Sequence, residues 1–283
     1  MNPMTVAVRA GVTRGLIETK QQFTNGMDLF VQFFWPVLIL VALFLMRNGH
    51  FEATGIGLGA LALPGVLGMM VASGGMIGIA QFLAVDREDG TLLRAKAVPN
   101  GMIGYLIGKI VMTTSTILVQ VVVTLAFGLF FLDGLDLTQP GAWSTLVWVF
   151  VLGMLATLPL GAVIGSVFEN PRSIGFISFP IMGLIAISGI FYPITSMPGW
   201  VQGIAQVFPI YWLGLGMRSA LLPGEAAVVE LGHSWRHWET VGVLGVWTIL
   251  GLAIAPIVLR RMARRESGSS VAARREKAMQ RAY

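Results

Sequence analysis

A run of 45 residues without a charged side chain, residues 173–217, limits the folds that this chain can adopt. A helix crosses the hydrocarbon core of a bilayer in about 20 apolar residues, so the run is too long for one span. Residues 174–192 can cross a membrane. The part that follows is interrupted by Pro193, Pro198 and Pro209, and it predicts short helices that lie at the far side of the bilayer or dip back into it. Broken backbone at membrane depth is tolerated only where protein or water satisfies it, which favours a transport path or external gate in this segment.

The composition of the whole chain indicates a polytopic membrane protein. Of its 283 residues, 55% are hydrophobic and only 12% are charged, whereas soluble domains carry roughly 25% charged residues. The chain has no cysteine, so disulfides, thiol chemistry and cysteine-based metal sites are excluded.

Apolar segments predict an all-α fold with six transmembrane helices. The spans are expected at residues 29–46, 58–84, 102–132, 143–168, 174–192 and 241–259. Short re-entrant or external helices are expected between the fifth and sixth spans. Residues 1–28 mix charged and apolar side chains and favour an amphipathic helix on the membrane surface, with a frayed tail as the alternative. Residues 29–259 then form one transmembrane domain, and residues 260–283 form a basic tail.

The third predicted span is longer than a bilayer requires. At 1.5 Å per residue it could reach roughly 45 Å, against a hydrocarbon core of roughly 30 Å. We therefore expect that its Lys109 end protrudes from the membrane or that the helix is tilted.

The distribution of Lys and Arg predicts that both termini are cytoplasmic. With the N-terminus inside, 16 of the 19 basic residues fall on cytoplasmic segments, as the positive-inside rule requires. Only Arg47, Arg218 and Arg236 fall outside. The net charge of +5 is then explained by a tail that anchors the topology and contacts anionic membrane lipid, and nucleic-acid binding is not expected.

The predicted spans contain few groups that could carry chemistry. Lys109 and Glu169 lie near cytoplasmic ends, and Gln81 and Gln120 are the polar residues deeper in the spans. Ion-coupled carriers use intramembrane Asp, Glu or His residues, so this pattern argues against a carrier driven by protons or sodium. It also argues against an intramembrane enzyme, which needs convergent acids, bases or metal ligands. Gln120 is expected to hydrogen-bond a neighbouring helix.

A glycine–lysine segment at residues 104–110 resembles a nucleotide-binding P-loop only superficially. It lacks one residue between its glycines and a Ser or Thr after Lys109, and it enters a span rather than following a strand. We therefore expect no ATPase site, no bound cofactor and no catalytic residue in this chain. Glycines four residues apart predict close helix packing instead. These pairs are Gly104/Gly108, Gly74/Gly78 and Gly161/Gly165.

Two histidines in the predicted external region, His233 and His237, are four residues apart and could share a helix face. A metal site would need a third ligand, such as Glu230 or His50. Hydrogen bonding at the membrane interface is the favoured interpretation, and no metal is expected.

The loop between the second and third spans, residues 86–99, is short and dense in both charges. Acidic residues near its start and basic residues near its end suit the dipole of a short helix. One interpretation is an ordinary solvated turn. The other is a helix that docks on a cytoplasmic partner, with charges that set its register and with Leu92 and Leu93 available for burial. A partner would supply the energy source that this chain lacks.

Two motifs resemble those of the ABC-2 type permeases, the membrane subunits of bacterial ABC exporters that include daunorubicin and antibiotic-resistance exporters. The first is the loop sequence Glu88-Asp89-Gly90-Thr91-Leu92-Leu93-Arg94, followed by Pro99. The second follows the order and spacing of the family over the uncharged run. Its residues are Ser188, Gly189, Phe191, Pro193, Met197, Pro198, Trp200, Pro209 and Arg218. The chain departs from the pattern at Phe208, where the family often has Asn.

The resemblance implies a permease of the bacterial plasma membrane that works with two separate ATP-binding cassette subunits and a second permease, identical or related. ATP and Mg would bind to the partner subunits and not to this chain. Residues 1–28 would form a connecting helix, and the second motif would form the outer gate. The loop would form the coupling helix, through Asp86, Arg87, Glu88, Asp89, Leu92, Leu93 and Arg94.

The resemblance also implies export of a hydrophobic or amphiphilic compound, such as a drug or antibiotic. A lipid-linked glycan or a lipid would suit the same uncharged interior. An ATP-independent secondary carrier and a membrane scaffold without transport are further alternatives. Transport by the chain alone under an ion gradient would favour the carrier.

Overall fold

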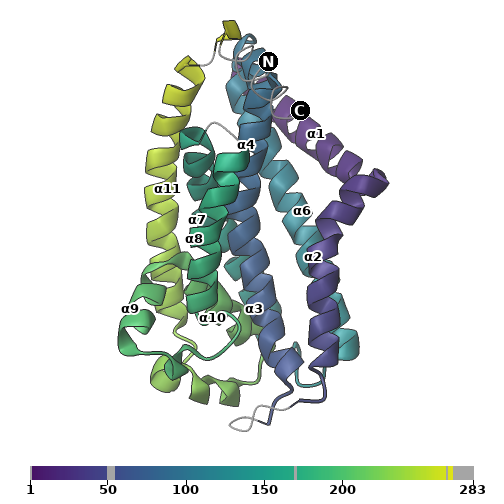
Figure 1. The fold of residues 1–283 in the computed structure, drawn as a ribbon, viewed down its shortest axis with the longest axis vertical. Coiled ribbons are helices and arrows are strands. Elements are labelled where there is room, and N and C mark those ends of the chain that lie inside the picture. The colour runs from purple at the N-terminus through teal and green to yellow at the C-terminus, as the bar shows by residue number, and fades with distance from the viewer. Residues whose placement is uncertain (1, 50–54, 169–170, 266, 270–283) are drawn as a thin grey trace.

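The computed structural model describes residues 2–49, 55–168, 171–265 and 267–269, and the regular elements in these ranges are all helices (Figure 1). The long helices are α1 (Pro3–Thr24), α2 (Gly26–Leu45), α6 (Gly101–Phe131), α7 (Ala142–Val167) and α11 (His237–Arg265). A central span runs from α3 (Leu58–Ser73) through a π-helical turn (Gly74–Gly78) into α4 (Ile79–Glu88). The shorter helices are α5 (Thr91–Lys96), α8 (Pro171–Ile187), α9 (Gly199–Val207) and α10 (Pro209–Leu221). The all-α prediction is confirmed for these residues.

Five helices are long and apolar enough to cross a membrane, and they correspond to the first, second, third, fourth and sixth predicted spans. They are Gly26–Leu45, Leu58–Glu88, Gly101–Phe131, Ala142–Val167 and His237–Arg265. The fifth, predicted at residues 174–192, is a shorter apolar helix that ends at Ile187. It ends there because Gly189 adopts a φ of 65°, a left-handed conformation that stops a helix. The predicted tail begins within α11, and its residues beyond 269 lie outside the described part of the chain.

The predicted N-terminal helix, residues 1–28, comprises α1 and the first residues of α2. Asn25 terminates α1, and its side-chain oxygen accepts a hydrogen bond from the Met27 N–H at 3.0 Å, which caps α2. Figure 1 shows α1 inclined to the long axis of the bundle while α2 runs along it. α2 is joined to α6 by the predicted hydrogen bond of Gln120, whose Nε2 donates to the Gln32 carbonyl oxygen at 3.2 Å.

α1 packs against α6 through glycines on both helices. Its buried face carries Ala7, Gly11 and Gly15. A Cβ on Gly15 would lie 2.5 Å from the carbonyl oxygen of Gly108, and a Cβ on Gly104 would lie 3.0 Å from that of Ala7. Larger residues would therefore separate the two backbones. The predicted Gly104/Gly108 packing face is confirmed, and its partner is α1.

The other two glycine pairs lie where the central span meets α7 and α6. A Cβ on Gly165 would lie 2.8 Å from the Cα of Ala80, and Gly161 faces the backbone of the π-helical turn. This pair is confirmed as a packing face. Gly74 faces a side chain of α6, whereas Gly78 has nothing within 4 Å, so the third prediction is only half confirmed.

The uncharged run continues past α8 into the interior of the bundle. α10 is buried around its circumference and contacts α3, α7 and α11. A Cβ on Gly68 of α3 would lie 3.0 Å from the backbone nitrogen of Gly214 in α10. Gly68 lies roughly 15 Å along α3 from the first residue of that helix, so α10 packs well inside one end of the bundle.

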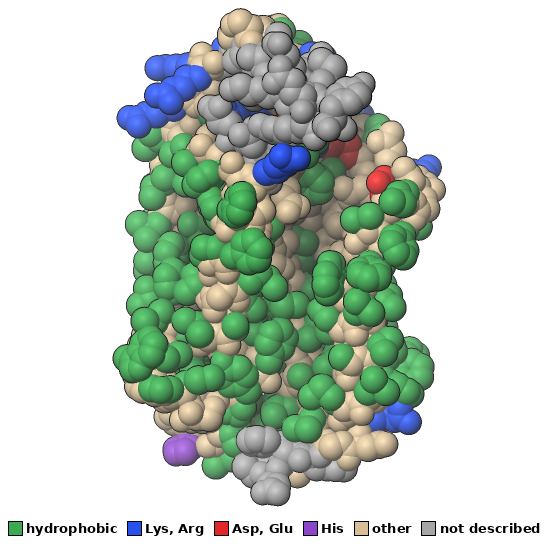
Figure 2. All heavy atoms as spheres, in the orientation of Figure 1, with side chains coloured by type: hydrophobic (Ala, Val, Ile, Leu, Met, Phe, Trp, Pro, Cys, Tyr) green, Lys and Arg blue, Asp and Glu red, His purple; other side chains and the backbone are tan. Residues whose placement is uncertain are grey.

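The surface of the bundle is divided by polarity. Figure 2 shows hydrophobic side chains over the middle of one face and Lys and Arg side chains mainly at the end near α1. A bilayer requires this separation, since its core is apolar and its polar boundaries accept charge.

Candidate functional site

The loop predicted to dock on a partner folds into a short helix, α5, between α4 and α6. α4 ends at Glu88, and the carboxylate of Asp89 accepts a hydrogen bond from the N–H of Thr91 at 2.7 Å, which begins α5. Gly90 and Asn100 have φ values of 78° and 54°, so left-handed residues turn the chain into and out of this segment. The result is a six-residue helix packed on α4, α6 and the end of α11.

The two faces of α5 have different surroundings. Leu92 and Ala95 are buried in a cluster with side chains of α4, α6, α7 and α11. Leu93 is half-buried, and Arg94 is exposed. The prediction that both leucines are available to a partner is wrong for Leu92, because that side chain fills the core of this chain.

Asp86 and Arg87, the first two residues of the predicted coupling set, are also buried. Asp86 accepts a hydrogen bond from the Tyr105 hydroxyl at 2.7 Å. Arg87 donates to the carbonyl oxygen of Ser166 at 3.4 Å and joins α4 to α7. These two residues hold the helices that support α5. The members of the set that reach the surface are Glu88, Asp89, Leu93 and Arg94.

Lys109 joins three helices next to this loop. Its Nζ lies 2.9 Å from Asp86 Oδ2 and 3.0 Å from Glu18 Oε2. On the other side of Glu18, Oε1 lies 2.6 Å from Arg14 Nε. The Lys109 side chain is only 8% exposed, so it is a buried cation held between a carboxylate of α4 and one of α1. The network links α1, α4 and α6 close to the point where the chain turns into α5.

The surroundings of Glu18 and Arg14 favour their charged forms. Burial alone would raise the pKa of the Glu18 carboxyl group, but hydrogen bonds from Arg14 and Lys109 outweigh burial and hold this pKa below its ordinary value of 4.5. Burial alone would lower the pKa of Arg14, and the hydrogen bond to Glu18 reverses the effect, so the pKa of Arg14 is raised. The pair is therefore charged at neutral pH.

A second ion pair is almost completely buried toward the opposite end of the bundle, where α9 and α10 lie (Figure 1). Arg218 of α10 and Glu230 have side chains that are 3% and 1% exposed, and Arg218 Nε lies 2.6 Å from Glu230 Oε1. Arg218 Nη1 also donates to the carbonyl oxygens of Gly189 at 3.2 Å and Ile190 at 3.1 Å. One guanidinium therefore joins α10, the end of α8 and the segment before α11.

The predicted outer motif divides into buried and exposed residues. Its buried members are Ser188, Gly189, Pro193, Pro209 and Arg218. Phe191, Pro198 and Trp200 are exposed, and Met197 is half-buried. The buried members fix the end of α8 and the start of α10, whereas the exposed members lie on or beside a 3₁₀ turn (Ile194–Ser196) and α9.

Phe208, the residue at which the motif departs from its pattern, precedes the first residue of α10. Its ring stacks on Trp247 of α11, with 6.1 Å between the ring centroids. The turn into α10 is thus anchored to α11 by an aromatic contact.

Glu230 and Glu18 are residues of these sites that sequence patterns did not reveal. Arg218 at the end of an apolar run requires a carboxylate if it is buried. However, Glu225, Glu230 and Glu239 all follow it in the sequence, and spacing does not choose among them. Glu18 lies 91 residues from Lys109, so no local pattern pairs these two residues.

The groups considered for a metal site have other contacts. Glu230 is paired with Arg218, and His233 Nδ1 lies 2.6 Å from the Val228 carbonyl oxygen. His50 lies outside the described residues. Among the residues that the structure describes, no group of three His, Asp or Glu side chains could hold a metal ion.

Comparison with known proteins identifies the family. The family model described as ABC-2 family transporter protein matches residues 21–257. Over 150 residues the chain is 27% identical to the probable multidrug ABC transporter permease YbhR of Escherichia coli (strain K12), and equally to the protein of the same name in Escherichia coli O157:H7. Each match covers 52% of this chain and spans only 40% of the length of the relative. Because the family model covers most of the chain, this protein belongs to the ABC-2 family of transporter proteins.

Proposed function

We propose that this chain is the membrane permease subunit of an ATP-driven ABC exporter, a multi-pass protein of the bacterial plasma membrane with both termini in the cytoplasm. α8 would be the fifth of six spans, and α9 and α10 would form the re-entrant segment after it. The observation that carries the proposal is the support of α5, a helix with an exposed charged face. Ion pairs of Lys109 join α1, α4 and α6 beside this helix, and contiguous networks of this kind can transmit a displacement.

Two ATP-binding cassette subunits, which would bind ATP and Mg, would dock on this chain and on a second permease, identical or related. The docking residues of this chain would be Glu88, Asp89, Leu93 and Arg94. Closure of the ATP-binding subunits would push α5 and the adjoining end of α6. The central span and α8 of both permeases would then close on the cargo. The P-loop-like segment of this chain has other roles, since its glycines pack on α1 and its lysine is ion-paired.

The cargo is proposed to be a hydrophobic or amphiphilic compound of the drug or antibiotic class. The E. coli relatives are named as probable multidrug permeases, and the uncharged run supplies apolar side chains along α8 and α10. A lipid-linked glycan or a lipid is the alternative cargo. Stimulation of ATP hydrolysis by candidate drugs, compared with stimulation by lipid-linked glycans, distinguishes the two classes.

The segment after α8 is proposed to be the outer gate. Two observations support this role: α10 packs inside the bundle, and Arg218 connects it to the end of α8. Substitution of Pro193 or Pro198 should reduce export more than it reduces assembly with the ATP-binding subunits. An equal loss of assembly would count against a gate.

The coupling role is tested with the full chain assembled with its ATP-binding subunits in lipid nanodiscs or liposomes. Leu93→Ala combined with Arg94→Glu should leave the permease folded but abolish ATP-driven transport. Lys20→Glu, an exposed charge reversal on α1, is the control and should transport normally. Normal transport by the double variant would contradict docking through α5. Transport by the chain alone under an ion gradient would contradict the ABC mechanism itself.

A further inference from the structure

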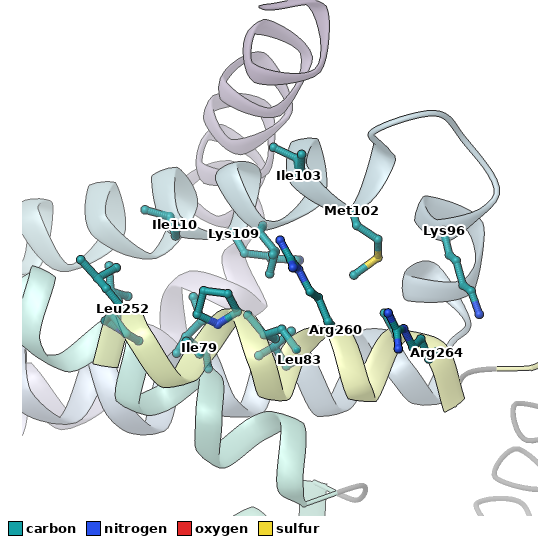
Figure 3. A pocket seen from close by; sticks show the side chains of 18 residues that line it. Ile79, Leu83, Lys96, Met102, Ile103, Lys109, Ile110, Leu252, Arg260 and Arg264 are labelled. Atoms are coloured by element: carbon teal, nitrogen blue, oxygen red, sulfur yellow. The ribbon is translucent and has the colours of Figure 1, made fainter. Parts of the chain in front are cut away.

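A cavity of about 570 Å³ lies between α4, α5, α6, α7 and α11, near the end of the bundle that carries α5 (Figure 3). Its volume is within the range of pockets that hold small organic ligands, roughly 300–1,000 Å³. Apolar side chains line its inner part, among them Ile79, Leu158 and Leu252. The proposed coupling and gating roles leave this cavity without a function.

The mouth of the cavity is basic. Lys96 of α5 and Arg260 and Arg264 of α11 line it, Lys109 of α6 lines the cavity farther from α5, and none of the described residues that line the cavity is acidic. Lys109 is balanced by the two carboxylates described above. Arg260 and Arg264 are exposed and form no ion pair with any residue that the structure describes. Figure 3 shows Arg260 extending from α11 toward α6, with Arg264 on the side of Lys96.

The polarity of the lining changes in one direction along α11. Leu252, Ala255 and Leu259 line the apolar part, and Arg260 and Arg264 line the mouth. At 1.5 Å per residue the distance from Leu252 to Arg264 is roughly 18 Å, more than half of a hydrocarbon core of roughly 30 Å. An elongated apolar slot with cations at one end is complementary to an amphiphile with an anionic head.

We propose that this cavity binds an anionic phospholipid, with an acyl chain between α6 and α11 and its phosphate between Arg260 and Arg264. Basic pockets between transmembrane helices on the cytoplasmic side suit anionic head groups, and the cytoplasmic location rests on the membrane orientation proposed above. Because Lys96 belongs to α5, the bound lipid braces the coupling helix against α11.

Binding is measured by native mass spectrometry of the purified full chain in detergent, titrated with phosphatidylglycerol and with phosphatidylcholine. Wild-type protein should prefer phosphatidylglycerol by roughly tenfold or more, as expected for two cations at the head group that form no ion pair with a described residue. Arg260→Gln with Arg264→Gln should remove the preference. Arg261→Gln with Arg265→Gln is the matched control, since it removes the same charge from the same turns of α11 outside the cavity, and it should keep the preference.

The apolar part of the site is tested by narrowing the slot. Leu252→Trp should weaken phosphatidylglycerol binding several-fold, whereas Leu250→Trp should not. Leu252 and Leu250 are 53% and 45% exposed, but only Leu252 lines the cavity. Unchanged binding by the Leu252→Trp variant would show that the head group binds without the cavity and would overturn the proposal.

Three other outcomes also overturn it. If both double-arginine variants lost the preference for phosphatidylglycerol equally, the lipid would be attracted diffusely to the basic end of α11. Displacement of the lipid by an equal concentration of inorganic phosphate would indicate a simple anion site. A second copy of the chain could cover the cavity in place of a lipid. Because the chain has no cysteine, the Leu252→Cys variant tests this by disulfide cross-linking. A disulfide-linked dimer that no longer binds phosphatidylglycerol would show that a second copy covers the cavity. These assays need no ATP-binding subunit, so their failure is distinct from a failure of the coupling test.

Discussion

Arg218 and Glu230 lie twelve residues apart in the sequence and form an ion pair from which solvent is almost excluded, with 2.6 Å between Nε and Oε1. The same guanidinium donates to the carbonyl oxygens of Gly189 and Ile190. Desolvation of two charges is costly, and it is compensated only where geometry is good and further hydrogen bonds are made. This pair therefore holds α10 in a defined position relative to the end of α8.

Removing one partner of this pair should be more damaging than removing both. Arg218→Met should lower the free energy of unfolding by about 3–5 kcal/mol, because Glu230 is left buried and uncompensated. Combining it with Glu230→Leu should recover part of the loss. Thermal unfolding of both single variants and of the double variant measures the coupling. Arg9→Gln, at an exposed arginine, is the control and should change stability by less than about 0.5 kcal/mol. If the double variant lost as much free energy of unfolding as the two single variants together, the two residues would not interact.

Lys109 should matter more to stability than Glu18, one of its two carboxylate partners. Lys109→Met should cost about 3–5 kcal/mol, since Asp86 would remain buried without its cation. Glu18→Gln should cost less, because Lys109 keeps Asp86 at 2.9 Å. Thermal unfolding ranks the two variants, with Lys20→Gln on the same helix as the control. ATP-driven transport should fall in the Lys109→Met variant even at a temperature where it stays folded. The opposite ranking would mean that Lys109 is not the centre of the network.

The contribution of Glu18 to stability should depend on pH. The pKa of Glu18 in the folded protein is below its ordinary value of 4.5. At a pH between these two pKa values, Glu18 therefore binds more protons in the unfolded chain than in the folded protein. The stabilisation is fully present above about pH 4.5 and is lost as the pH falls through the lower, folded-state pKa. The difference in Tm between wild type and Glu18→Gln should therefore shrink as the pH is lowered from neutral toward about pH 3. A difference that stays constant over this window would argue against the shift.

The contact between α1 and α6 should tolerate no added side chain. Gly15→Ala should lower the free energy of unfolding by about 1–3 kcal/mol, the usual cost of overpacking. The reason is that the new Cβ would lie 2.5 Å from the Gly108 carbonyl oxygen. Gly183→Ala in α8, where nothing lies within 4 Å, should be neutral or stabilising by about 0.5–1 kcal/mol. Hydrogen exchange along α1 and thermal unfolding report the two effects. Equal behaviour of the two variants would show that close packing of α1 is unimportant.

Charge reversal at Glu88 and Asp89 should uncouple ATP hydrolysis from transport without loss of expression. Asp89→Lys should be the more damaging single change, because the Asp89 carboxylate also accepts a hydrogen bond from the Thr91 N–H at the start of α5, a contact worth about 1 kcal/mol. Asp89→Asn keeps a hydrogen-bond acceptor but removes the charge, so it distinguishes the effect of the hydrogen bond to Thr91 from the effect of the charge. Transport and ATP hydrolysis are measured on the assembled complex. Wild-type transport by the doubly reversed variant would remove the coupling role.

Helix positions could be predicted because they depend on properties that are local in the sequence. Five of the predicted spans correspond to helices of spanning length, since apolar length and basic flanks are read directly from neighbouring residues. The exception, residues 174–192, ends early because Gly189 is left-handed, and hydropathy carries no information on a single φ angle. Leu92 is expected from the sequence to be available to a partner but is buried in this chain, because the pattern of a six-residue helix does not show which face meets its own core.

Composition and hydropathy already indicate that this protein is helical, that it is suited to a membrane, and that a short charged helix and a proline-divided segment interrupt its spans. Which carboxylates accompany Lys109 and Arg218 follows instead from the packing of the folded chain. Glu18 is 91 residues from Lys109, and Glu230 is one of five glutamates that follow Arg218 in the sequence. The partner of a buried charge is the opposite charge that lies near it in space, which need not lie near it in the sequence. The cost of desolvation makes such a partner necessary.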